Sequence, residues 1–133
     1  MSRRNARKNA FFLLFQMDFN QEEEYEQVKE IFFAEKKEPV EEEDKQFIVN
    51  EVEGTRSHLK EIDLIIGESA KGWNTDRMSK VDLAILRLAV YELRFGEDTP
   101  VGVAINEAVE LAKKFSSDEA PGFINGILGK VVK

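Results

Sequence analysis

The sequence predicts an all-α protein, a bundle of about six to seven helices packed around a central apolar helix. Apolar residues recur at helical spacing along most of the chain, and no segment shows the alternation of apolar and polar residues that is typical of a strand. In residues 79–95 apolar side chains would cover nearly every side of a helix, so that helix must be buried on most of its faces. A chain of 133 residues is long enough to bury such a core, and we expect one domain over residues 1–133.

Three predicted helices precede the central one. The first spans about residues 3–19, with phenylalanines beside its regularly spaced alanines and leucines, and the second spans about residues 24–37. The third begins at the acidic cluster 41–44, since negative charge stabilises a helix N-terminus, and keeps its apolar period to about Ala70. We expect it to be one long helix, with Gly54 as the point where it would bend.

The central helix has a marked start and a marked stop. Ser79 followed three residues later by Asp82 is a capping signal, and a glycine and then Pro100 end the helix. Charged residues interrupt its apolar run, which argues against a membrane span. Two further helices are expected after it, with apolar positions over about 104–115 and 123–131.

The composition favours a binding protein over an enzyme. The chain has no cysteine, which excludes a disulfide framework and a thiolate zinc site. His58 is the only histidine, and no nucleotide-binding or nucleophile motif occurs, so we expect no catalytic residue, no metal and no cofactor. The N-terminal region lacks the cleavage site of a secretory signal, and we expect a cytoplasmic protein.

Charge is distributed unevenly along the chain, whose net charge is -7. Residues 21–44 are strongly acidic, and solvation of an exposed face explains such a run. The first turns of the first helix instead carry Arg3, Arg4, Arg7 and Lys8 with no acidic residue before them. Cations at a helix N-terminus oppose the macrodipole and repel one another, so a bound anion would stabilise this end. A solubilising, frayed terminus is the alternative interpretation.

Four blocks of the sequence carry a family pattern, in order and over essentially the whole chain. They are R-R-N-A-R-K-N-A-F-F-L-L-F-Q-M-D at the start, L-R-L-A-V-Y-E-L at 86–93, A-I-N-E-A-V-E-L-A-K-K-F at 104–115 and F-I-N-G-I-L at 123–128. Together they resemble the NusB family of bacterial transcription antitermination factors. The resemblance implies about seven helices in two subbundles. The same helical domain also precedes some ribosomal RNA cytosine methyltransferases, but this chain stops where that domain ends, which favours the stand-alone factor.

The resemblance also implies a function and its partners. Family members bind the boxA element of nascent ribosomal RNA, as a single strand, together with NusE, a small-subunit ribosomal protein. This assembly helps RNA polymerase to read through terminators in ribosomal RNA operons. Relatives occur as monomers and as dimers, so a homodimer is one possible state of this chain.

Site residues are implied by their match to the family pattern. The RNA-binding residues would be Arg3, Arg4, Arg7, Lys8, Phe15, Asp118, Glu119 and Phe123. Phe15 would stack on a base without the hydrogen bond that a tyrosine donates, and Phe12 stands where many relatives have glutamine. Asp76 and Asp82 fall at acidic positions that face NusE in relatives, although both also suit helix caps.

Two other function classes compete with this interpretation. A helical protein-interaction adaptor would use the basic N-terminus only for solubility and would bind its partner without RNA. A DNA-binding helix-turn-helix is disfavoured, because no helix after a short turn carries a cluster of base-reading Arg, Asn or Gln side chains.

Overall fold

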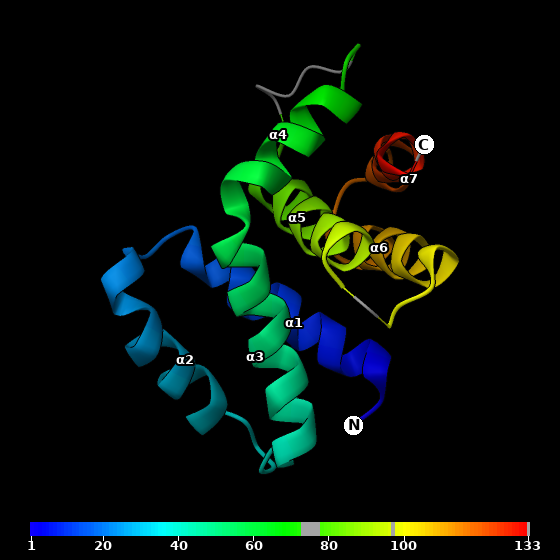
Figure 1. Cartoon of the computed structure of the whole chain (residues 1–133). Helices are drawn as coiled ribbons and strands as arrows, with labels where there is room; N and C mark the ends of the chain where they lie inside the picture. The colour runs from blue at the N-terminus through cyan, green and yellow to red at the C-terminus, as the bar shows by residue number, and fades with distance from the viewer. Residues whose placement is uncertain (73–77, 97, 133) are drawn as a thin grey trace. The chain divides into compact units, whose positions relative to one another are not determined.

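A computed structural model describes residues 1–72, 78–96 and 98–132 of the chain. These residues form seven α-helices and one short 3-10 helix, and they contain no strand (Figure 1). The predicted all-α class is therefore confirmed. The chain divides into two compact units, Met1–Glu53 and Gly54–Lys133, and the division falls within one helix.

Unit 1 contains the first two α-helices and most of the third. Its elements are α1 (Arg3–Met17), the 3-10 helix η1 (Glu22–Glu24), α2 (Tyr25–Ala34) and the part of α3 (Glu42–Ser57) up to Glu53. Helix α1 begins where the sequence predicts, because the hydroxyl of Ser2 accepts a hydrogen bond of 3.0 Å from the backbone N–H of Asn5. The buried face of α1 carries the alanines and leucines that the helical period selected, with Ala6, Ala10 and Leu13 fully buried.

Unit 2 is built around α5 (Lys80–Arg94), as the apolar stretch predicts. Helix α5 contacts α4 (Leu59–Ser69), α6 (Val101–Phe115) and α7 (Ala120–Val131) (Figure 1). Its start is capped by the hydroxyl of Ser79, which accepts a hydrogen bond of 3.0 Å from the backbone N–H of Asp82. Six consecutive or near-consecutive apolar residues of α5 are buried, namely Ala84, Ile85, Leu86, Leu88, Ala89 and Val90.

The prediction of one long helix from the acidic cluster to Ala70 is wrong. The chain makes two helices there, and α3 ends at Ser57 while α4 begins at Leu59. His58 between them leaves the helical region, with φ of -109° and ψ of 19°. Its ring lies flat on the ring of Phe95, with centroids 4.0 Å apart and planes at 11°. The reason for the break is thus a tertiary contact with the end of α5, which the apolar period cannot report.

Gly54, the expected bend, stays within α3. Its role is close packing, since a Cβ atom added there would lie 2.2 Å from Cζ of Tyr91. No helix among the residues described is long and apolar enough to span a membrane.

Candidate nucleic-acid interface

The basic head, which we define as Arg3, Arg4, Arg7 and Lys8, occupies the first two turns of α1. Arg3 and Arg4 are exposed and Lys8 is half-buried, whereas Arg7 is only 7% exposed. The exposed members place positive charge at the surface of unit 1. Arg7 is part of the packed interior of that unit, so the four residues do not form one uniform exposed patch.

The Arg3 and Arg7 side chains share one side of α1, as their spacing predicts, and that side meets α3. The guanidinium of Arg3 lies 4.0 Å from the centroid of the Phe47 ring, and that of Arg7 lies 5.6 Å from it. A cation over an aromatic face is attracted by the ring quadrupole, by about 0.5 to 1 kcal/mol at an exposed site. Phe47 therefore holds Arg3 in place at the surface, a role that the sequence did not reveal.

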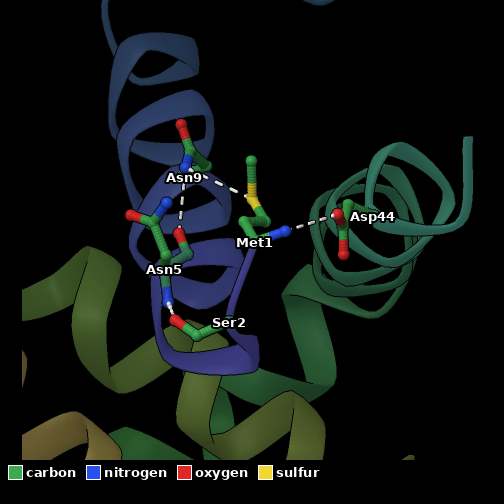
Figure 2. A network of polar contacts seen from close by, with 5 residues as sticks. All are labelled: Met1, Ser2, Asn5, Asn9 and Asp44. Atoms are coloured by element: carbon green, nitrogen blue, oxygen red, sulfur yellow. Dashed lines mark hydrogen bonds and ion pairs between the residues drawn. The ribbon is translucent and has the colours of Figure 1, made fainter. Parts of the chain in front are cut away.

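A polar network ties the start of the chain to both helices (Figure 2). The Met1 amino group lies 3.0 Å from Oδ2 of Asp44 on α3. The Asn9 amide donates a hydrogen bond of 2.9 Å to the backbone carbonyl of Asn5 and a longer one of 3.9 Å to the Met1 sulfur. These contacts fix Asn9, which is 6% exposed, at the edge of the head.

A hollow of about 490 Å³ lies beside the head in unit 1. Lys8 and Phe12 of α1 line it together with Lys36 and Lys37, which follow α2. The sequence pattern does not reveal these two lysines as candidate site residues, because they lie within the acidic run 21–44 whose summed charge is negative. Only the approach of the α2–α3 connection to α1 shows that they extend the basic head.

Phe15 lies in a line of aromatic rings along α1. Its ring centroid is 6.2 Å from that of Phe11 and 5.1 Å from that of Phe19. Phe15 is half-buried, whereas Phe19 is 62% exposed. The ring of Phe15, on which a base would stack, is thus supported by neighbouring rings within unit 1, and Phe19 adds an exposed ring beside it.

The other three implied RNA-binding residues belong to unit 2. Asp118 and Glu119 are exposed in the connection between α6 and α7, and Phe123 is partly exposed in the first turn of α7. The backbone N–H of Phe123 bonds to the carbonyl of Glu119 at 3.3 Å, so the start of the helix orders both. These three residues therefore form one local group, at one end of α7.

Of the two residues implied for partner binding, Asp82 lies in the first turn of α5. Asp82 is 9% exposed, and its Oδ1 accepts a hydrogen bond of 2.5 Å from the hydroxyl of Ser116. Asp76 lies outside the described residues. Among the residues described, no group of three or more His, Cys, Asp or Glu side chains is placed to hold a metal ion.

Comparison with known proteins identifies the family. The family model described as the NusB family matches residues 4–133. The chain belongs to the NusB family. Transcription antitermination protein NusB of Natranaerobius thermophilus is 50% identical over 131 residues, which cover 98% of this chain and 94% of that protein. The NusB of Agathobacter rectalis is 45% identical over 130 residues and 98% of each chain.

Solved NusB structures share the fold. A structure of T. maritima NusB superposes with a TM-score of 0.87 at 35% identity, over 99% of this chain and 91% of that one. A crystal structure of the antitermination factors NusB and NusE in complex with double-stranded RNA superposes with a TM-score of 0.79 at 29% identity. That match covers 98% of this chain and 95% of the other. The family that the four sequence blocks suggested is confirmed.

Proposed function

We propose that this chain is a transcription antitermination factor that binds the boxA element of nascent ribosomal RNA together with NusE, within an antitermination complex of RNA polymerase. The single observation that carries the proposal is the family match over residues 4–133, which includes nearly all of the basic head. A similar NusB chain has been solved with both NusE and RNA, which supports the two partners.

The head and Phe15 would bind single-stranded RNA by two complementary contacts. The guanidinium groups of Arg3 and Arg4 bind phosphate oxygens, and the ring of Phe15 stacks on a base, which is worth about 1 to 3 kcal/mol per base. Arg7 and Lys8 complete the group, Arg7 mainly by packing against the Phe47 ring over which Arg3 also lies. Three neutralised phosphates, at Arg3, Arg4 and Lys8, would give a salt slope of about -2 for a single strand.

Asp118 and Glu119 would act differently, because a carboxylate repels phosphate. Their oxygens accept hydrogen bonds, so we propose that they bind the amino groups at the edges of unstacked bases. Phe123, next to them in unit 2, offers a second ring for stacking. These contacts select a sequence, whereas those of the head supply affinity.

NusE would bind at the start of α5, with Asp76 and Asp82 as the proposed partner-binding residues. Asp82 is largely buried, so it acts mainly by holding the helix end to which NusE binds. Because an RNA contact of NusE adds to those of this chain, each protein raises the affinity of the other for RNA by the same factor.

We further infer that the chain acts by binding alone, catalyses no reaction and needs no cofactor. It works as one domain over residues 1–133, in the cytoplasm, where bacterial transcripts are made. A homodimer that covers the head would compete with RNA for that surface. Dilution of the protein would dissociate such a dimer and so favour RNA binding.

Fluorescence anisotropy with boxA RNA and a scrambled RNA tests the proposal. The variant Arg3→Ala/Arg4→Ala removes two exposed positive charges from the head and leaves the buried Arg7 untouched. The control Lys113→Ala/Lys114→Ala removes the same charge from the exposed end of α6. We expect a preference for boxA that grows with NusE, that is lost in the head variant and that the control retains.

Two results would contradict this proposal. Equal affinity for boxA RNA and for the scrambled RNA, measured with NusE present, would contradict the boxA assignment. If this chain binds NusE with the same affinity in the presence and in the absence of RNA, the function as a protein-interaction adaptor would be favoured instead.

A further inference from the structure

The hollow beside the basic head brings together side chains from two segments that are distant in the sequence. Lys8 and Phe12 come from α1, and Lys36 and Lys37 come from the connection after α2. Asn9, which is 6% exposed, also lines the hollow and accepts a hydrogen bond of 2.5 Å from Nζ of Lys36. The hollow therefore has a fixed polar wall rather than a set of independent solvated chains.

Lys36 is held where its positive charge is disfavoured. Burial lowers the pKa of Lys36 below its ordinary value, and the positive charge of Lys8 lowers it further, against a smaller opposite effect of Glu35. The ammonium also lies 4.1 Å from the centroid of the Phe32 ring. An ammonium has three N–H donors, so an anion can bind it in addition to Asn9. Such an anion would relieve both the repulsion from Lys8 and the cost of burial.

We propose that this hollow binds a further nucleotide of the RNA, with its backbone phosphate between Lys8 and Lys36 and its base beside Phe12. The inference rests on the proposed function and extends its RNA track from the head of α1 onto the α2–α3 connection. Lys37 is exposed at the rim, where it adds a second, weaker phosphate contact.

Acidic residues also line the hollow, and their positions are compatible with this ligand. Asp44 lies 3.0 Å from the Met1 amino group, so its charge is compensated within the structure. Glu38 and Glu41 are exposed, where water and salt screen them. The volume of about 490 Å³ is within the range of small-ligand pockets and leaves room for a nucleotide.

An RNA strand fits the hollow better than an acidic protein segment does. Lys8 belongs both to the head and to the hollow, so one continuous polyanion can contact both. Phe12 adds an aromatic ring, and single-stranded RNA combines phosphate charge with bases that stack on such rings. A carboxylate side chain would use the lysines but not the ring.

The test compares Lys36→Gln with Lys29→Gln in the full chain, using RNAs shortened one nucleotide at a time from each end. Lys29 is a matched control, because it is a lysine of α2 already paired with Glu26 at 3.1 Å and with Glu53 at 3.4 Å. We expect Lys36→Gln to weaken binding of the longer RNA about fivefold and to reduce the salt slope by about 0.7, the value for one phosphate on a single strand. Lys36→Arg and Lys29→Gln should bind like the native chain.

RNA length separates a direct contact from an indirect effect of the Lys36–Asn9 bond. The penalty of Lys36→Gln should disappear once the RNA lacks the nucleotide that reaches the hollow. Lys37→Gln, at an exposed position, provides a second variant that leaves the Asn9 bond intact. A penalty that is the same for every RNA length would overturn the inference.

The remaining outcomes distinguish this inference from the proposed function. If Lys36→Gln and Lys37→Gln bind like Lys29→Gln while Arg3→Ala/Arg4→Ala is weakened, the hollow is not part of the RNA track and the proposed function stands. If the native chain binds no RNA, both the inference and the proposed function fail.

The NMR signal of the Asn9 side-chain amide distinguishes binding of a free anion from binding of RNA. An equal shift with inorganic phosphate alone would assign the hollow to free phosphate and overturn the RNA assignment.

Discussion

The hydroxyl of Ser116 donates a hydrogen bond of 2.5 Å to Oδ1 of Asp82 and so joins the end of α6 to the start of α5. Asp82 lies in the region proposed for NusE, and Ser116 begins the connection that carries Asp118 and Glu119, which are proposed for RNA. Within unit 2, one hydrogen bond therefore links the two proposed surfaces. A change at either end of that bond is expected to reach the other.

Ser116→Ala tests this link. Removal of the hydroxyl takes one donor from a carboxylate that is 9% exposed, and an incompletely bonded buried group costs about 1 to 3 kcal/mol. We expect a lower free energy of unfolding in urea and weaker RNA binding in the presence of NusE. Ser117→Ala, at the exposed next position, is the control. Identical behaviour of the two variants would show that the bond does not matter.

The contact of Arg3 with Phe47 is expected to be measurable as a coupling energy. A double-mutant cycle of Arg3→Met and Phe47→Leu, read by urea unfolding, should give about 0.5 to 1 kcal/mol. The coupling should shrink when RNA is bound, because the guanidinium then also binds phosphate. A cycle of Arg4→Met with Phe47→Leu should give a smaller coupling. Equal values in the two cycles would contradict the assigned geometry.

Lys36 and Lys29 should affect the pH dependence of stability with opposite signs. Burial and Lys8 lower the pKa of Lys36 below 10.5, so over the window just below 10.5 the folded state binds fewer protons than the unfolded state. The contribution of Lys36 to the free energy of unfolding therefore rises with pH through that window. For Lys29 burial opposes the charge, but the hydrogen bond to Glu26 and the charge of Glu53 raise its pKa above 10.5. The stability contributed by Lys29 is present below 10.5 and is lost as pH rises through the folded-state value.

Urea unfolding between about pH 8 and about pH 11 measures the difference. Relative to Lys36→Gln, the native chain should gain stability as pH rises, and relative to Lys29→Gln it should lose stability. The same sign for both variants would mean that the environment assigned to one of the two lysines is wrong.

Gly54→Ala is expected to destabilise unit 2 although alanine is the better helix former. The new Cβ would lie 2.2 Å from Cζ of Tyr91, whose ring also stacks near His58 and Phe95. Overpacking costs about 1 to 3 kcal/mol, which outweighs the gain of about 1 kcal/mol from helix propensity. Gly67→Ala is the control, because nothing lies within 4 Å of its added Cβ, and it should stabilise the protein. The midpoint temperatures of thermal unfolding of the two variants test this prediction. A higher midpoint for Gly54→Ala than for the native chain would contradict the close packing at Gly54.

The local signals in the sequence are strong enough to define most of the helices. The cap at Ser79, the apolar period and Pro100 depend on contacts between residues a few positions apart, which a sequence displays directly. The same holds for the family, since its motifs are continuous blocks. The basic residues of α1 were visible for the same reason.

The tertiary structure alone decided the rest. The helix breaks at His58 because its ring stacks on Phe95. Arg7 is buried where it packs against the Phe47 ring. Lys36 joins the basic hollow through its hydrogen bond to Asn9. Each of these contacts joins residues that are more than 25 positions apart. The sequence by itself determined which segments are helical and which family they form, because those properties are local or continuous. Which charges are exposed, buried or gathered into one site depends on long-range packing, and only the folded chain establishes it.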